Sequence, residues 1–195
     1  EIGPGKGALT DYLVKKKCKE IIIIEKDKRL ISYLNFKFKD IQNLRILNED
    51  ALSLDYETLN KRNIIIIGNL PFNISTQLLV KWLSSSKWPS FYKKMILMFQ
   101  NEVAERIIAK KGNKNFGRLS VLAQSRCKVK KLAKAPSSVF SPAPKVDGLI
   151  LEFTPTDEYK NVNIEKLKNL LLISFRHRRK KIKTPLKKYS TILKK

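Results

Sequence analysis

The chain has 195 residues, of which 43% are hydrophobic and 30% are charged. This composition excludes a disordered chain, and no apolar run approaches the roughly 20 residues that cross a bilayer, so we expect a soluble globular protein without a membrane partner. Forty-one Lys and Arg against seventeen Asp and Glu leave a formal net charge of +24, which favours a polyanionic partner, nucleic acid before an anionic membrane surface.

Short apolar runs alternate with amphipathic stretches along the first two-thirds of the chain. The runs of four isoleucines at 21–24 and 64–67 are typical of strands buried on both faces of a parallel sheet. Further strands are predicted at 44–47, 94–99, 128–132 and 146–153, the last two antiparallel. Helices are predicted at 8–17, 28–38, 76–83, 102–109, 117–127 and 164–175.

This alternation predicts an α/β fold with a mostly parallel, doubly wound, Rossmann-like sheet. The carboxyl ends of its strands meet at one edge, where ligands bind. We expect a main domain over residues 1–155 and a small, basic, helical subdomain over 156–195 that is incomplete. A strand should also precede the turn at the start of the chain, so we expect an N-terminal segment outside this sequence.

The first seven residues, Glu-Ile-Gly-Pro-Gly-Lys-Gly, place three glycines ahead of a helix. Glycines there let the backbone turn sharply and approach a ligand. The spacing is not that of the dinucleotide-binding motif, and an ordinary tight turn is an equal interpretation.

Two acidic residues follow at later strand ends. Glu25 ends the next strand, where a carboxylate can accept hydrogen bonds from ribose hydroxyls. Asp50 ends the third strand and could accept from an adenine amino group. Each alone could be a solvated strand end or a helix cap, but their register with the glycine turn favours a nucleoside ligand without a polyphosphate.

The segment Asn69-Leu70-Pro71-Phe72 follows the second isoleucine run. The exocyclic amine of adenine is a poor nucleophile, and two acceptors, the Asn69 side chain and the Pro71 carbonyl, could orient its lone pair. Phe72 offers a face on which an extruded base can stack. Methyl transfer from an activated donor needs orientation more than acid–base catalysis.

A simpler interpretation of this segment is a turn that caps the following helix. Ser75 or Thr76 would then be the N-cap residue. That interpretation accounts for Ser75 but not for the whole string before it.

The chain resembles the ribosomal RNA adenine dimethyltransferases. The resemblance covers most of the chain and rests on residues 1–10, 68–75, 100–106 with 117–121, and 139–147. It implies a class I methyltransferase fold, S-adenosylmethionine as methyl donor, and transfer of two methyl groups to each of two adjacent adenines of small-subunit rRNA. A monomeric cytoplasmic protein that acts on a pre-30S-type particle and assists small-subunit assembly is also implied.

The resemblance assigns roles by position. The implied cofactor contacts are Glu1, Gly3, Gly5, Glu25, Asp50, Ala51 and Asn69. The implied acceptor clamp is Asn69, Leu70, Pro71 and Phe72, where the family usually has Tyr in place of Phe72. Phe140 would stack on the target base from the other side, although a loop Phe packed under three prolines is an equal interpretation. The family's N-terminal arm is absent from this sequence.

A basic block runs from Arg176 to Lys181. Arg176, Arg178 and Arg179 are predicted to contact RNA phosphates, and the alternative is a solvated helix end. His177 has no carboxylate or nucleophile nearby in sequence, so it receives no catalytic role. Cys18 and Cys127 form no metal-binding motif, which indicates reduced cytosolic thiols and no metal site.

Two other functions remain open. A large-subunit rRNA methyltransferase of the macrolide-resistance type would share the Asn-x-Pro-aromatic clamp. A non-enzymatic RNA-binding assembly or transcription factor could use the same fold, but the intact glycine turn, Glu25, Asp50 and Asn69 argue against it.

Overall fold

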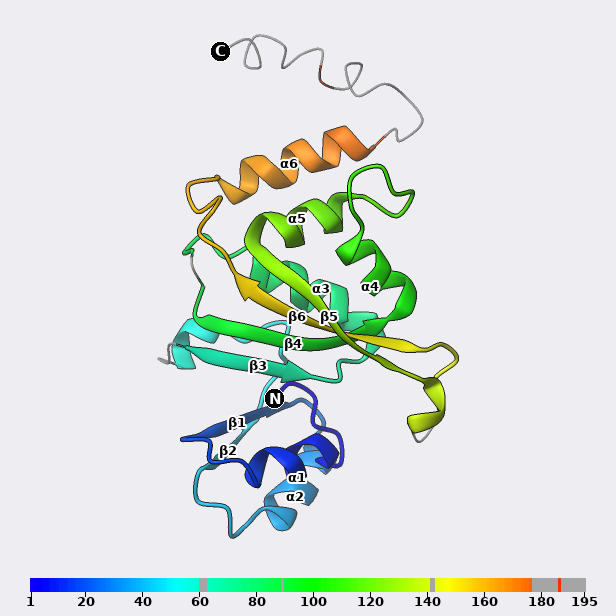
Figure 1. Cartoon of the computed structure of the whole chain (residues 1–195). Helices are drawn as coiled ribbons and strands as arrows, with labels where there is room; N and C mark the ends of the chain where they lie inside the picture. Colours follow the sequence, from blue (N-terminus) through cyan, green and yellow to red (C-terminus); the bar gives the residue numbers. More distant parts are fainter. Residues whose placement is uncertain (60–62, 89, 141–142, 177–185, 187–195) are drawn as a thin grey trace.

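The computed structural model describes residues 1–59, 63–88, 90–140, 143–176 and 186. Its strands form two sheet segments (Figure 1). In the first, β1 (Ile21–Glu25) pairs in parallel with β2 (Leu44–Asn48). The second has the order β3-β4-β6-β5, with bounds Ile64–Gly68, Tyr92–Gln100, Gly148–Pro155 and Cys127–Ala135.

The first three residues join the two segments. Ile2 donates its N–H to the carbonyl of Ile67 in β3 at 3.0 Å, and Gly3 donates to Ile24 in β1 at 2.9 Å. In Figure 1 the N-terminus accordingly lies between β1 and β3. The joined sheet is parallel from β2 to β4 and antiparallel at β6 and β5, so the predicted mostly parallel α/β sheet is confirmed.

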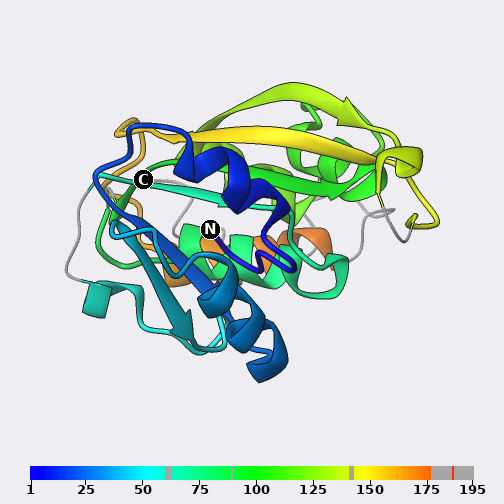
Figure 2. The same cartoon turned by 90° about the horizontal axis from the view of Figure 1, so that it is seen from below.

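The described part of the chain has six α-helices. They are α1 (Ala8–Val14), α2 (Lys28–Lys37), α3 (Phe72–Leu83), α4 (Asn101–Ile108), α5 (Arg118–Arg126) and α6 (Ile164–Phe175). Short 3-10 turns lie at Tyr56–Leu59 and Ser137–Val139. α2 packs on β1 and β2, whereas α3, α4 and α5 pack on the longer segment and α6 lies over α5. Figure 2 shows α3 and α6 on the same side of β4 and β6.

Apolar side chains form two cores, one for each sheet segment and the helices that pack on it. The larger core contains Trp82, Phe99 and Phe153, and the smaller one contains Ile23 and Leu34 between α2 and β1. Burial of these large side chains supplies most of the driving force for folding.

The boundaries of two helices differ from the prediction by more than one residue. α3 begins at Phe72 rather than at residue 76, because Pro71 is its N-cap, with a φ of −53° that suits a helix start. Ser75 is buried inside the first turns of the helix, so neither Ser75 nor Thr76 is the N-cap. α1 ends at Val14, before three consecutive lysines that offer no apolar face.

The C-terminal helix α6 has the predicted bounds. Its Ile164 and Leu171 belong to the larger core, and the N–H of Thr156 bonds to the carbonyl of Arg126 at 2.9 Å. The domain boundary near residue 156 stays a prediction. Within the described part of the chain, no helix is long and apolar enough to cross a membrane.

Candidate active site

A cavity of about 440 Å³ lies where the carboxyl ends of β1 and β2 meet the start of α3. This volume is within the range of small-molecule sites. The residues predicted from sequence that line it are Gly3, Gly5, Glu25, Asp50, Ala51 and Pro71. The structure therefore brings most of the predicted cofactor residues together around one cavity.

The glycine turn presents open backbone to this cavity. Gly3 and Gly5 have φ values of 64° and 57°, a left-handed conformation that costs little only for glycine. A Cβ atom at Gly5 would meet nothing within 4 Å, whereas one at Gly7 would lie 2.8 Å from Cε2 of Phe38. Gly5 thus leaves room on the ligand side, and Gly7 lets the loop pack on α2. A nucleoside cofactor that needs close backbone approach fits this loop.

Glu25 is held by its own turn. Its Oε1 accepts the backbone N–H groups of Lys26 at 2.7 Å and Asp27 at 2.8 Å. Its Oε2 accepts no hydrogen bond from the residues that the structure describes. One fixed oxygen therefore remains for ribose hydroxyls.

Asp50 lies two residues beyond the end of β2, and both of its carboxylate oxygens have partners. Oδ1 accepts the N–H of Leu52 at 2.9 Å, and Oδ2 pairs with Nζ of Lys26 at 2.8 Å. The hydrogen bond from Lys26, followed by that from Leu52, lowers the pKa of Asp50. Lys26 itself lines the cavity. Its contact with Asp50 was not predicted, because no sequence spacing links two strand ends 24 residues apart.

Glu1 does not line the cavity. Its Oε2 accepts a hydrogen bond of 2.6 Å from Oγ1 of Thr10, a fully buried residue of α1. Burial raises the pKa of the Glu1 carboxyl, and the bond from Thr10 opposes that shift. In this structure Glu1 ties the glycine turn to α1.

The segment that carries the implied acceptor clamp, residues 69–72, is called the acceptor loop below, and it corrects one expectation. The Pro71 carbonyl accepts the N–H groups of Ile74 at 3.0 Å and Ser75 at 3.1 Å, so the prediction that this carbonyl is an acceptor for the target amine is wrong. As the N-cap carbonyl it belongs to the first turn of α3. The carbonyl of Leu70, one residue earlier, accepts no hydrogen bond from the described residues.

The side chains of the loop divide between core and solvent. Leu70 is only 1% exposed, so its side chain anchors the loop and only its backbone can face a substrate. Asn69 is exposed, and its side chain makes no hydrogen bond to a described residue; Phe72 is half-buried. Asn69, Leu70 and Phe72 do not line the cofactor cavity, but Pro71 does. Pro71 therefore links the cavity to the acceptor loop.

Phe140 follows the turn Ser137–Val139, which connects β5 to β6. β6 begins at Gly148 opposite Gln100, the last residue of β4, so this connection lies at the edge where the parallel strands end. Asp147 fixes it, because its Oδ1 accepts the N–H of Ser137 at 2.8 Å. Phe140 is half-buried and does not line the cavity, so its stacking role stays a prediction.

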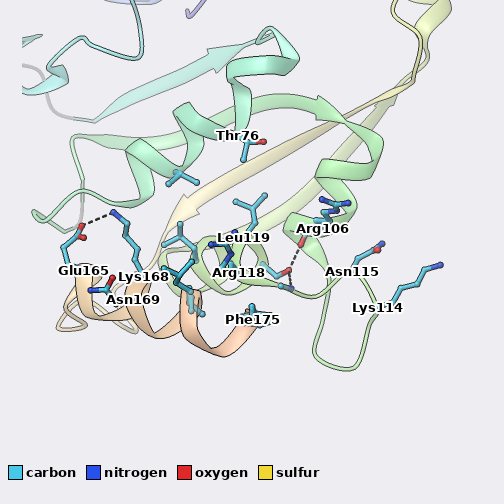
Figure 3. A pocket seen from close by; sticks show the side chains of 16 residues that line it. Thr76, Arg106, Lys114, Asn115, Arg118, Leu119, Glu165, Lys168, Asn169 and Phe175 are labelled. Atoms are coloured by element: carbon cyan, nitrogen blue, oxygen red, sulfur yellow. Dashed lines mark hydrogen bonds and ion pairs between the residues drawn. The ribbon is translucent and has the colours of Figure 1, made fainter. Parts of the chain in front are cut away.

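A larger cavity of about 920 Å³ lies between α3, α5 and α6. Figure 3 shows its labelled basic side chains, Arg106, Lys114, Arg118 and Lys168. None of the predicted cofactor residues lines it, so its greater size does not make it the cofactor site. Arg176 is exposed immediately after Phe175, which lines this cavity. Arg178 and Arg179 lie outside the described residues.

Comparison with known proteins identifies the family. The sequence model of the family described as ribosomal RNA adenine dimethylase matches residues 1–192. The ribosomal RNA small subunit methyltransferase A of Pelagibacter ubique is 40% identical over 186 residues, which are 95% of this chain and 70% of that protein. The protein of that name from Ehrlichia ruminantium is 39% identical over 189 residues, covering 96% of this chain and 71% of its own.

Comparison with solved structures supports the predicted fold. A dimethyladenosine transferase from Plasmodium falciparum superposes with a TM-score of 0.83 at 33% identity, over 95% of this chain and 66% of that one. The 23S rRNA methyltransferase ErmE gives a TM-score of 0.75 at 23% identity, over 96% of this chain and 73% of its own, a likeness that concerns the fold alone. The predicted class I methyltransferase fold is confirmed, as is S-adenosylmethionine as the methyl donor. The chain belongs to the ribosomal RNA adenine dimethylase family of S-adenosylmethionine-dependent methyltransferases.

Proposed function

We propose that this chain dimethylates the N6 amines of adjacent adenines in small-subunit rRNA. The observation that carries the proposal is the position of Pro71, which lines the cofactor cavity and directly follows two unengaged acceptors, the Asn69 side chain and the Leu70 carbonyl. A base held by those acceptors lies next to the methyl donor.

On the cofactor side, S-adenosylmethionine supplies an activated methyl group. The open backbone at Gly3 and Gly5 admits its amino-acid end, and the free oxygen of Glu25 accepts from the ribose. Asp50 accepts from the adenine amino group, with Ala51 beside the ring. Binding the adenine in this way requires Lys26 to share or release Oδ2 of Asp50.

On the acceptor side, the oxygens of Asn69 and Leu70 accept the two hydrogens of the target amine. This would aim its lone pair at the methyl group that S-adenosylmethionine supplies when bound. The proton that N6 carries after the transfer leaves to solvent. Phe72 and Phe140 stack on the extruded base from two sides. Orientation, rather than a general base, carries the catalysis.

The RNA partner is held by the basic surface. The net charge of +24 favours phosphate contacts that add affinity without choosing a sequence. Arg176, Arg178 and Arg179 supply such contacts. We further propose that the protein acts as a cytoplasmic monomer on a pre-30S-type particle, as part of small-subunit assembly.

Methyl transfer from radiolabelled S-adenosylmethionine tests the proposal. The full-length protein is offered unmethylated small-subunit particles, naked small-subunit rRNA or large-subunit rRNA, and primer extension then locates the modified adenines. We expect stops at two adjacent adenines of small-subunit rRNA alone. Methylation of large-subunit rRNA would identify the macrolide-resistance type of enzyme, and RNA binding without methylation would identify a non-enzymatic factor.

A further inference from the structure

Lys81 of α3 reaches across to the loop that follows β2. Its Nζ donates to the carbonyls of Leu52 and Leu54, both at 2.6 Å, and lies 5.2 Å from the centroid of the Tyr56 ring. Tyr56 in turn donates its hydroxyl to the carbonyl of Ala51 at 2.9 Å. Three carbonyls of one short loop are therefore held by two side chains.

These contacts are stronger than ordinary surface bonds. A cationic donor shortens and strengthens a hydrogen bond, and the Tyr56 ring adds a cation–π contact. Burial lowers the pKa of Lys81, while the carboxylates of Asp55 and Asp50 act in the opposite direction. The partly desolvated ammonium group of Lys81 is therefore used to hold the backbone of this loop.

The loop held in this way presents Asp50, Ala51 and Leu52 to the cofactor cavity. Lys81 comes from the helix that begins at Phe72 in the acceptor loop, roughly 13 Å further along the axis at 1.5 Å per residue. One rigid helix consequently contacts both the loop for the cofactor's adenosine and the loop for the target base.

We infer that Lys81 is a positioning residue that sets the cofactor's adenosine pocket relative to the acceptor loop. The inference rests on the proposed assignment of Asp50 and Ala51 to the adenosine of the cofactor. Without the ammonium group, the carbonyls of Leu52 and Leu54 lose their donor and the loop samples other conformations. Cofactor binding must then order the loop again, which weakens affinity, while the acceptor loop keeps its own contacts.

The test uses the full-length protein with Lys81→Met, which keeps the length of the side chain and removes the donor. Calorimetric affinity for S-adenosylhomocysteine should fall about tenfold, the effect of one charge-assisted hydrogen bond. KM for S-adenosylmethionine should rise in parallel, while kcat at saturation and KM for RNA change less than about threefold. Lys81→Arg, whose guanidinium can donate to both carbonyls, should restore most of the affinity. Lys87→Met is the matched control. The Lys87 side chain is 78% exposed, and its ion pair is long, with Nζ 3.7 Å from Oε2 of Glu57.

Unchanged affinity in a folded Lys81→Met protein would overturn the inference, as would an equal loss in Lys87→Met. If Lys81→Met does not fold, Lys81→Gln and Lys81→Arg decide: affinity should decrease from wild type through Arg to Gln, and equal values refute the role. Asp50→Asn separates this inference from the proposed site. If Asp50→Asn also binds S-adenosylhomocysteine normally, the assignment of the loop is wrong; if only the Lys81 variants bind normally, Lys81 alone has no positioning role.

Discussion

Nζ of Lys26 lies 2.8 Å from Oδ2 of Asp50, so the carboxylate assigned to the cofactor's adenine already has a cationic partner. The Lys26 side chain is 76% exposed and that of Asp50 is 33% exposed. Ion pairs this exposed are weak and screened by salt. The pair can therefore open when a ligand enters, and until then it holds the pKa of Asp50 below its ordinary value.

Replacing Lys26 with Met should raise the pH below which cofactor binding is lost. Lys26 lowers the pKa of Asp50, and Asp50 must be ionised to accept from an amino group. Without Lys26 the pKa of Asp50 rises towards its ordinary value, so affinity is lost at a higher pH as the solution is acidified. Calorimetric titration with S-adenosylhomocysteine across the acidic range measures the shift. Lys28→Met serves as control, and superimposable pH profiles for Lys26→Met and wild type would refute the effect.

Replacing Asn69 with Ala should slow methyl transfer strongly while RNA affinity stays nearly intact. The amine then keeps one acceptor, the Leu70 carbonyl, and its misorientation costs on the order of 10²-fold in kcat. Single-turnover methylation and filter binding separate the two effects. Gln77→Ala, at an exposed position of α3, the helix that follows this loop, is the control. Loss of RNA binding with normal turnover would contradict the clamp.

Replacing Glu25 with Ala should weaken cofactor binding by roughly ten- to a hundredfold. A hydrogen bond to a charged group contributes about 1.5–3 kcal/mol, and each 1.4 kcal/mol is a factor of ten. Glu57→Ala provides the comparison, because Glu57 lies outside the cavity. Equal affinities for both variants in calorimetry would remove Glu25 from the site.

The glycines at positions 5 and 7 should respond differently to alanine. Gly5→Ala places a methyl group in open space on the cavity side, so its main effect is on cofactor affinity. Gly7→Ala would bring Cβ within 2.8 Å of Phe38, so it should lower the melting temperature more than Gly5→Ala does. Both share the strain of a positive φ, about 1–2 kcal/mol. Thermal melts without ligand distinguish them, and equal melting temperatures would contradict the packing argument.

RNA binding should weaken steeply with salt, and Arg176→Ala should make the dependence shallower. Each phosphate contact that is lost reduces the slope of log K against log salt concentration by about one. Lys39→Ala should leave the slope unchanged, because Lys39 follows the C-cap of α2. The helix α2 lies at the opposite end of the molecule from α6 (Figure 1). A flat salt plot for the wild type would contradict the basic-surface argument.

The local elements of the fold could be predicted from sequence because periodicity and burial determine them. The isoleucine runs, the glycine turn and the strand-end positions of Glu25 and Asn69 are of this kind. The first turn of α3 was not predicted, because Pro71 was interpreted only as part of the acceptor motif and is also the helix N-cap. That same turn uses the Pro71 carbonyl, which leaves the Leu70 carbonyl as the proposed second acceptor.

Contacts between distant segments could not be predicted. Lys26 with Asp50, and Lys81 with the carbonyls of Leu52 and Leu54, depend on how the strands and α3 are placed in space. A lysine in a chain with 41 Lys and Arg carries no sequence signal of its own. Its role becomes visible only through the groups that it contacts.

The hydrogen bonds of Ile2 and Gly3 to β3 on one side and β1 on the other have a consequence for how such enzymes diversify. The side chains proposed for the cofactor's nucleoside come from the β1–β2 side of this junction, and the proposed acceptor loop comes from the β3 side. Sequence change on the acceptor side can therefore alter which nucleotide is modified without rebuilding recognition of the methyl donor.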